Sequence, residues 1–252
     1  MRKRRSECLQ RRHNAAWLDQ GQGQRPRFTT SSCDAQHSGS GVWRSKAPAA
    51  LTEWRVLMRF LVLYAHPVAN SFGAAVHRCV LDALATAGHE VDDCDLYAEN
   101  FQPVLSADER RHYHNPCANT SSISAEIDRL LRAEGLVFVF PTWWYGVPAI
   151  LKGYIDRVWV PGIAFELVNG RTRPSLLRHI VRFAVVTTYG SPWWLNKFVV
   201  NDPSRHAFMR GIRRLVSRRA DTLWLALYGT DYADDARRHR FLERVATRLR
   251  NF

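Results

Sequence analysis

Short apolar runs alternate with segments of helical periodicity from Met58 to the C-terminal end of the chain. The apolar runs predict buried β-strands, because a parallel sheet is covered on both faces and its strands carry no polar face. The periodic segments between them predict helices, and the alternation is typical of an α/β domain. The predicted strands span residues 59–65, 90–96, 136–140, 181–187 and 223–228.

Helices are predicted after these strands, and several carry end signals. Ser71 is a suitable N-cap for the first helix, and Gly88 is a suitable terminator because glycine tolerates the left-handed backbone that ends many helices. Pro148 and Pro203 stand at predicted first helical positions, where the missing N–H has no partner to lose. The apolar face of the first helix comprises Phe72, Val76, Val80 and Leu84. The later helices are predicted at residues 124–134, 148–159, 203–218 and 233–250.

Five parallel strands with intervening helices predict a flavodoxin-like α/β fold. Its five-stranded parallel sheet has the order 2-1-3-4-5, with helices on both faces. Ligands bind to such a sheet beyond the carboxyl ends of the strands, at the switch point between strands 1 and 3. The residues that follow strands 1, 3 and 4 are therefore the candidates for a binding site.

The first 57 residues show neither the helical period nor the strand period, and they are rich in Arg, Gln, Ser and Gly. We expect a disordered N-terminal extension there, or a mis-started reading frame upstream of a true start at Met58, followed by one domain at residues 58–252. Residues 1–57 hold eleven Lys and Arg against four Asp and Glu, which is more than half of the net charge of +13. Because the excess lies mostly outside the predicted domain, the charge does not predict a nucleic-acid partner.

The cysteines predict neither a disulfide framework nor a metal site, because they are odd in number and no two have the Cys-x-x-Cys spacing. They are Cys8, Cys33, Cys79, Cys94 and Cys117. No run reaches the roughly 18 apolar residues that a membrane-spanning helix needs. We therefore expect no transmembrane segment and a cytoplasmic protein.

The loop after the first predicted strand, residues 66–73, runs into a helix whose free N–H groups can hold a phosphate. His66 would donate a hydrogen bond to a pyrophosphate, with Ser71 and the backbone of Phe72 and Gly73 beside it. The alternative is a capping loop with a structural histidine. The loop has no G-x-G-x-x-G pattern, which counts against a dinucleotide fold of the Rossmann type.

Two further strand ends are rich in aromatic residues. Trp143, Trp144 and Tyr145 precede Gly146, and consecutive side chains of an extended segment cannot all enter one core. The segment 187–194 brings hydroxyl groups, a glycine and more aromatic residues to the same edge. Flat aromatic walls with backbone N–H groups suit a planar heteroaromatic cofactor. The alternatives are core or interface packing by the tryptophans and an ordinary Gly-Ser-Pro turn.

Four segments together resemble the NAD(P)H:quinone oxidoreductase family, flavoproteins of flavodoxin-like fold. They read LYAHPVANSF at 63–72, DLYAENFQPVLS at 95–106, FPTWWYGVPAILKGYIDRVWVPGIAF at 140–165 and VVTTYGS at 185–191. The resemblance implies an enzyme that passes hydride from NAD(P)H through bound FAD, or FMN in some branches, to a quinone or similar small electrophile. It also implies a homodimer with the flavins at its interface.

The resemblance assigns site residues by position. Contacts to the phosphate and ribityl region would come from His66, Ser71, Phe72 and Gly73. The isoalloxazine ring would lie along Pro141, Thr142, Trp143, Trp144 and Tyr145, and its pyrimidine side would contact Thr187, Thr188, Tyr189 and Gly190. Phe165 would face the substrate pocket of the partner subunit. Tyr189 replaces a second glycine of the mammalian members, and their Tyr and His for proton handling have no clear counterparts, so no catalytic acid or base is assigned.

Two other functions compatible with the fold are an ancillary, regulatory flavoprotein of a potassium-efflux antiporter and a one-electron carrier of the flavodoxin type. The Ser- and Thr-rich phosphate loop of such carriers is absent after Ala65. An aromatic crevice also favours a small-molecule acceptor over a protein partner.

Overall fold

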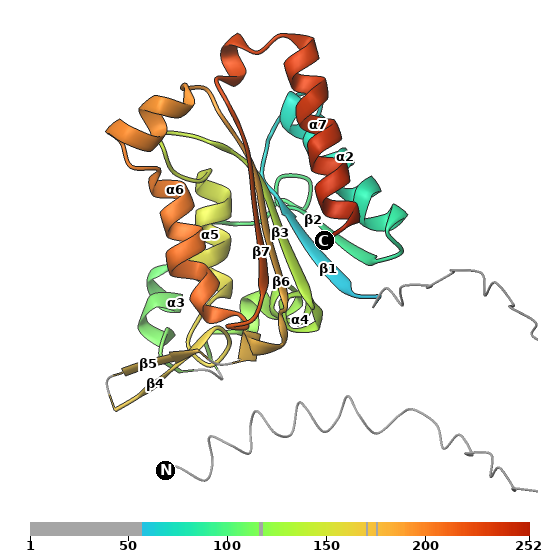
Figure 1. Ribbon diagram of the computed structural model, residues 1–252. Coiled ribbons are helices and arrows are strands. Elements are labelled where there is room, and N and C mark those ends of the chain that lie inside the picture. The colour runs from blue at the N-terminus through green and yellow to red at the C-terminus, as the bar shows by residue number, and fades with distance from the viewer. Residues whose placement is uncertain (1–56, 116–117, 170, 175) are drawn as a thin grey trace, which may run out of the picture. The chain divides into compact units, whose positions relative to one another are not determined.

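The computed structural model describes residues 57–115, 118–169, 171–174 and 176–252. Of the extension predicted to be disordered at residues 1–57, all but the last residue lies outside the described residues. A five-stranded parallel sheet forms the centre of the described domain (Figure 1). Its strands are β1 (Arg59–Tyr64), β2 (Glu90–Asp95), β3 (Gly135–Thr142), β6 (Arg182–Tyr189) and β7 (Asp221–Tyr228). Their order is β2-β1-β3-β6-β7, which confirms the predicted 2-1-3-4-5 order counted along the chain.

Apolar side chains alternate between the two faces of the sheet, so each face has its own core. On one face, Val62 and Val137 pack with helices α2 (Phe72–Thr86) and α7 (Asp235–Arg250). On the other face, Leu63, Phe138 and Val185 pack with α4 (Ser124–Arg132) and α5 (Ala149–Val158). Figure 1 shows these two helical layers on either side of the strands. The predicted cover of helices on both faces is therefore confirmed.

Helix α2 begins and ends as its sequence predicts. The Ser71 hydroxyl accepts a hydrogen bond from the Ala74 N–H, which satisfies one of the unpaired donors at the helix N-terminus. Gly88 follows the last turn with a φ of 89°, and the His89 N–H returns to the Leu84 carbonyl at 3.1 Å. This pairing closes the helix in a Schellman motif. The cap directs the loop after β1 against the carboxyl edge of the sheet.

The helix predicted at residues 203–218 is wrong as a single element. The segment contains a short α6 (Pro203–His206), the wide π-type turn η4 (Ala207–Gly211) and the 3-10 turn η5 (Ile212–Leu215). The wide turn places the Phe208 ring against Phe138 and Phe140, at centroid distances of 5.0 and 5.3 Å. Glycine is a poor helix former, and Gly211 ends the wide turn. Core packing of one aromatic side chain thus overrides the regular helical period.

Other boundaries differ from the predictions by one or two residues. Strands β3 and β6 extend two residues further than predicted, so Thr142 and Tyr189 are still in the sheet. Pro148 is the N-cap of α5, one position before the first helical residue, whereas Pro203 is the first residue of α6. Strand β2 ends at Asp95 and is the edge strand beside β1.

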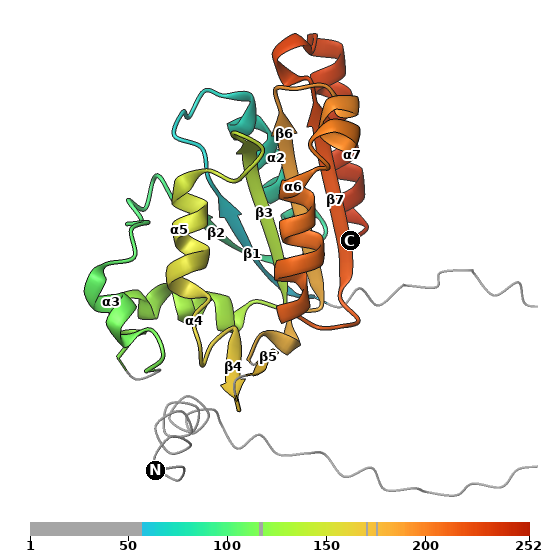
Figure 2. The same ribbon diagram turned by 90° about the vertical axis from the view of Figure 1, so that its left-hand side faces the viewer.

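The structure also contains elements that the periodicity did not predict. They are α3 (Ala107–His112), the antiparallel hairpin of β4 (Phe165–Val168) and β5 (Arg171–Pro174), and the short turns η1 (Ser121–Ile123), η2 (Leu176–His179), η3 (Leu195–Val199) and η6 (Thr230–Tyr232). In both views the hairpin lies at the end of the sheet opposite the carboxyl ends of the strands (Figures 1 and 2). The candidate site residues after β1, β3 and β6 share the other end.

Candidate functional site

His66 organises the loop between β1 and α2. Its Nδ1 accepts a hydrogen bond from the Val68 N–H at 3.0 Å and lies 3.0 Å from the Ser71 hydroxyl. Because Nδ1 is an acceptor, the ring proton is assigned to Nε2, whose N–H is left as the donor. A Cβ atom on Gly73 would lie 3.2 Å from the imidazole, which is a tight contact. The loop therefore presents an imidazole N–H beside the N-terminus of α2, where anions bind.

The aromatic turn after β3 has a strained backbone. The N–H of Trp143 donates to the Gly146 carbonyl at 3.1 Å, and the Gly146 N–H donates back at 2.9 Å. Between them, Trp144 and Tyr145 have φ angles of 49° and 59°, which is the left-handed region that bulky side chains rarely adopt. The hydroxyl of Ser204 holds the turn by donating to the Tyr145 carbonyl at 2.7 Å. As a result the Trp144 side chain is 98% exposed at the edge of the sheet.

The end of β6 forms the neighbouring wall. The hydroxyl groups of Thr142 and Thr187 are 3.0 Å apart and link the ends of β3 and β6. The Tyr189 side chain is only 1% exposed, and its hydroxyl donates to Asp202 at 2.7 Å. Its ring stacks on Tyr228 with a centroid distance of 4.6 Å. Burial raises the pKa of Tyr189 well above its ordinary value, and the Asp202 carboxylate adds to this effect. The hydroxyl therefore stays protonated.

A cleft of about 480 Å³ lies between these two walls. It is lined by Pro141, Thr142, Trp143, Trp144, Thr188, Gly190, Thr230 and Asp231. A Cβ atom at Gly190 would lie 2.6 Å from an oxygen of the Asp231 carboxylate, so a larger residue there would displace the Asp231 side chain from the cleft wall. The His66 ring is 6.2 Å from the Trp143 ring, so the loop after β1 adjoins the same cleft.

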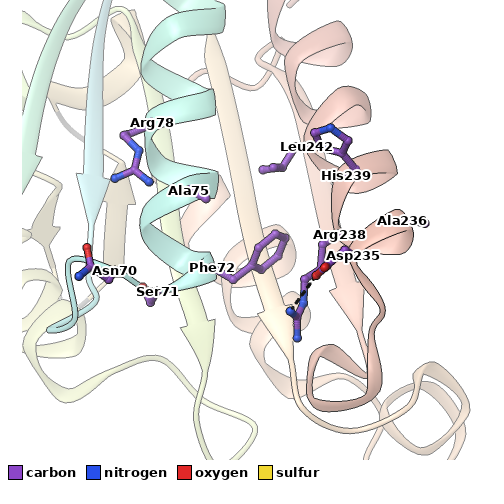
Figure 3. Close-up of a pocket in the computed structure, with 10 residues that line it drawn as sticks. All are labelled: Asn70, Ser71, Phe72, Ala75, Arg78, Asp235, Ala236, Arg238, His239 and Leu242. Carbon is purple, nitrogen blue, oxygen red and sulfur yellow. Dashed lines mark hydrogen bonds and ion pairs between the residues drawn. The ribbon is translucent and has the colours of Figure 1, made fainter.

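A second cavity, of about 710 Å³, lies on the other side of that loop, between α2 and α7. Figure 3 shows the Phe72 ring pointing from the start of α2 toward α7, where Arg238 and Asp235 face it. The Arg238 guanidinium lies 6.0 Å from the centre of the Phe72 ring. The remaining lining residues are Asn70, Ser71, Ala75, Arg78, Ala236, His239 and Leu242. The cavity is thus basic with an aromatic wall, and it shares Ser71 with the loop after β1.

The structure brings most of the predicted site residues to the cleft or to the second cavity. Six line the cleft: Pro141, Thr142, Trp143, Trp144, Thr188 and Gly190. Ser71 and Phe72 line the second cavity, His66 lies in the loop after β1, and Gly73 lies in the first turn of α2 beside the His66 ring. Thr187 is buried and touches the cleft only through its contact with Thr142.

Three predicted residues are placed differently. The Tyr189 side chain points away from the cleft into the packing around Asp202, so only its neighbours form the wall. Tyr145 is absent from the cleft lining and contributes its carbonyl to the contact with Ser204. Phe165 begins β4, at the opposite end of the sheet, and packs against the core of its own chain. Within one chain it does not meet the cleft.

Sequence reasoning missed Thr230 and Asp231 in the cleft and Asp202 behind it. Thr230 and Asp231 directly follow β7, and only the residues after strands 1, 3 and 4 were considered as candidates. Examining all five strand ends would have found both. No local pattern marks Asp202, since its role depends on contacts with Tyr189 and Tyr228.

Comparison with known proteins agrees with this geometry. A family model described as "Flavodoxin-like fold" matches residues 58–247. An uncharacterized NAD(P)H oxidoreductase of Haemophilus influenzae is 33% identical over 156 residues, which cover 62% of this chain and 76% of that protein. The human ribosyldihydronicotinamide dehydrogenase [quinone] is 32% identical over 164 residues, covering 59% of this chain and 71% of the relative. The structure of an NAD(P)H:quinone oxidoreductase from Methanothermobacter marburgensis has a TM-score of 0.66 at 27% identity, covering 77% of this chain and 98% of that one.

The chain belongs to the flavodoxin-like family, in its branch of NAD(P)H:quinone oxidoreductases. The resemblance seen in the sequence is therefore confirmed, and the protein is an oxidoreductase of this type. Within the described residues, no helix is both long and apolar enough to cross a membrane.

Proposed function

We propose that this chain is a flavin-dependent NAD(P)H oxidoreductase that transfers hydride from a nicotinamide, through bound FAD, to a quinone or similar small electrophile. The observation that carries the proposal is the cleft of about 480 Å³ at the carboxyl edge of the sheet, between the aromatic turn and the end of β6. Residues 58–252 would form the flavin-binding domain. Its location would be the cytoplasm, where NAD(P)H is supplied.

The lining of the cleft fits an isoalloxazine ring. Pockets for small ligands measure about 300–1,000 Å³, and this cleft falls within that range. Trp143 and Trp144 supply flat apolar surface, which stacks favourably on a planar ring. The hydroxyl of Thr188 and the backbone N–H and C=O groups of Gly190, which has no side chain of its own to cover them, would supply polar contacts for the carbonyls and nitrogens of the ring. Tyr145, Thr187 and Tyr189 would support these walls from behind.

The second cavity supports FAD over FMN. A cofactor whose ring lies in the cleft and whose phosphates lie at the 66–73 loop would extend an adenylate half into the hollow between α2 and α7. That hollow offers the Phe72 ring for stacking and the cations Arg78 and Arg238 for an anion. FMN would leave it unused.

The loop after β1 is suited to the phosphates. Among the described residues, the Nε2–H of His66 has no hydrogen-bond partner, and the N-terminus of α2 adds backbone N–H groups and the positive end of its dipole. The backbone of Phe72 and Gly73 belongs to that first turn. We therefore assign His66, Ser71, Phe72 and Gly73 to phosphate and ribityl contacts.

When bound, the flavin supplies the two-electron chemistry, and the protein supplies binding, orientation and electrostatics. The Asp231 carboxylate, at the edge of the cleft beside Gly190, can accept a hydrogen bond but cannot donate one while ionised. It therefore suits an N–H of the ring or of a nicotinamide carboxamide. We assign no residue as catalytic acid or base.

A homodimer is part of the proposal. Four large apolar side chains that follow β6, Trp193, Trp194, Phe198 and Val199, are each more than half exposed. Patches of this kind on soluble proteins mark interaction sites. Phe165 lies at the far end of the sheet in its own chain, so it would reach a substrate pocket only from a second copy. We propose that the copies pair through the apolar side chains after β6.

The alternative functions are less well supported. A one-electron carrier would also hold a flavin ring, but the Ser- and Thr-rich phosphate loop of such carriers is absent after Ala65. Regulation of a potassium-efflux antiporter has no specific support in the described residues, and the relatives compared above are named as oxidoreductases.

Anaerobic reduction of the purified full-length chain, loaded with FAD, tests the proposed reaction. We expect stoichiometric NADH or NADPH to bleach the flavin absorbance, and a small benzoquinone to restore it in a separate step. Steady-state rates should then show the parallel lines of a ping-pong mechanism. A loaded protein that neither nicotinamide reduces would refute the reaction, and slow reduction with fast oxidation by one-electron acceptors would favour the carrier.

A further inference from the structure

A buried carboxylate lies behind the β6 wall of the cleft. Asp202 is 7% exposed, and its Oδ1 accepts a hydrogen bond of 2.7 Å from the Tyr189 hydroxyl. Its Oδ2 accepts from the Tyr228 hydroxyl at 3.3 Å. Both oxygens accept, as an ionised carboxylate requires. In the part of the chain that the structure describes, no cation forms an ion pair with it. Burying a charge without a cation is costly, so the position calls for a function.

The backbone around Asp202 is strained as well. Asn201 and Asp202 have φ angles of 57° and 43°, so two consecutive residues other than glycine are left-handed. Such strain persists where the surrounding structure fixes it, and it clusters at functional sites. Here the Asp202 N–H donates to the carbonyl of the buried Asn196 at 2.7 Å, and the His206 N–H donates to the Asp202 carbonyl at 3.1 Å. The backbone of Asp202 is thus fixed by hydrogen bonds on both sides.

The same short segment reaches both walls of the cleft. Asp202 binds Tyr189, which stands between the cleft residues Thr188 and Gly190. Two positions later, Ser204 is buried and donates to the carbonyl of Tyr145 in the aromatic turn. A shift of this segment would therefore move the two walls relative to each other.

We propose that Asp202 is a positioning residue of the flavin cleft, which holds the β6 wall through Tyr189 and whose negative charge lowers the reduction potential of the bound flavin. The inference rests on the proposed function. Reduction adds negative charge to the ring, and a carboxylate one side chain behind the wall opposes it in a medium of low dielectric constant. The raised pKa of Tyr189, caused by burial and then by Asp202, keeps the phenol a donor to the carboxylate.

The charge is tested with the substitution Asp202→Asn, which keeps the size of the side chain. The two-electron midpoint potential of FAD bound to the full chain is measured by equilibration with a reference dye. We expect a more positive potential than in the wild type. The matched control is Asp221→Asn, which makes the same charge change at the exposed start of β7. This position lies at the amino ends of the strands, away from the cleft. The control should keep the wild-type potential.

The hydrogen bonds are tested with Tyr189→Phe and Tyr228→Phe, which keep the rings and the carboxylate. We expect the FAD dissociation constant to rise about tenfold for Tyr189→Phe and about twofold for Tyr228→Phe, because the first bond is shorter and fully buried. A mere loss of packing would not produce this ranking. The phenylalanine variants also keep the inference testable if Asp202→Asn does not fold.

The outcomes are separable. Suppose that the wild type binds FAD and reacts with NAD(P)H. The inference is then overturned if Asp202→Asn has the same potential as Asp221→Asn, or if the phenylalanine variants bind FAD as tightly as the wild type. Either result leaves the proposed function intact. A wild type that takes up no FAD overturns both.

Discussion

Trp144 shows how a single residue can serve a site at the expense of local stability. Its backbone is left-handed and its side chain is 98% exposed, so neither conformation nor burial favours tryptophan at this position. A bound aromatic ring would compensate for both. In the proposed site, Trp144 would therefore link the strained turn directly to ligand binding.

Replacing Trp144 with alanine should weaken flavin binding without destabilising the fold. We expect the FAD dissociation constant to rise about tenfold, or about 1.4 kcal/mol, through loss of a stacking surface. NAD(P)H oxidation at limiting FAD should fall in parallel, while the thermal unfolding midpoint of the FAD-free protein stays unchanged. Val104→Ala, at an exposed apolar residue outside both the cleft lining and the proposed dimer surface, is the control. Full flavin content and full activity in Trp144→Ala would contradict the site assignment.

Arg238 reports on the choice between FAD and FMN. It faces the Phe72 ring in the second cavity, where an adenylate half would bind. We expect Arg238→Gln to weaken FAD about tenfold, by loss of a charge-assisted contact worth about 1.5 kcal/mol, and to leave FMN affinity unchanged. Isothermal titration with each nucleotide measures both, with Arg240→Gln on an exposed face of α7 as control. Equal loss for both nucleotides would argue against an adenylate in this cavity.

The sequence predicted the cleft residues better than the orientation of their side chains. Trp143, Trp144 and Gly190 were found because strand ends meet at one edge of a parallel sheet. That rule places the backbone but does not say which way a side chain turns. The side chain of Tyr189 turns inward because Asp202, 13 residues later in the chain, supplies a buried acceptor for its hydroxyl.

At the scale of elements, α3 and α5 are joined by one carboxylate. The side chain of Glu109 accepts from the Ser106 N–H at 2.8 Å in a capping box, and from Arg157 of α5 at 2.6 Å. Ser122 adds a third donor at 3.0 Å. Burial alone would raise the pKa of Glu109, but these hydrogen bonds outweigh it and lower the pKa to about 2.

This pKa gives a pH dependence with a defined sign. A carboxyl group whose pKa in the folded state lies below its ordinary value of 4.5 stabilises the fold above that value and loses this effect as the pH falls toward 2. We expect Glu109→Gln to lower the free energy of unfolding at neutral pH by on the order of 1–2 kcal/mol, with the difference shrinking below pH 4.5. Denaturant titrations at a series of pH values measure it, with the exposed Asp128→Asn as control. A difference independent of pH would show that the charge of Glu109 is not involved.

Most helices followed from periodicity, and four of the five strands followed from their continuous apolar runs. The edge strand β2 is no such run, because four of its six residues are acidic and it is only partly buried. The 203–218 segment did not follow from periodicity, since its turns widen to pack Phe208 against the core. The β4–β5 hairpin was missed because its strands are four residues each and half of their positions are polar or charged. The α3 helix was missed although Ser106 and Glu109 have capping-box spacing.

At the scale of the molecule, the exposed aromatic residues after β6 predict self-association. At micromolar concentration, we expect the molar mass of the wild type measured by light scattering to be twice the chain mass of 29.0 kDa, as for a dimer. Phe198→Asp places a charge on this surface and should shift the protein to a monomer, because an unpaired charge in an apolar interface is costly. Val104→Asp, on an exposed apolar residue elsewhere, should stay dimeric. A wild type that is monomeric at every concentration would refute the pairing.

The proposed function requires that the cleft and the second cavity together hold one flavin nucleotide. The direct measurement is the visible absorbance of the purified full-length protein, before and after incubation with FAD and FMN, followed by mass analysis of the released chromophore. We expect the absorbance bands of a bound flavin and the mass of FAD. A folded protein that stays colourless and takes up neither nucleotide in excess would contradict the account.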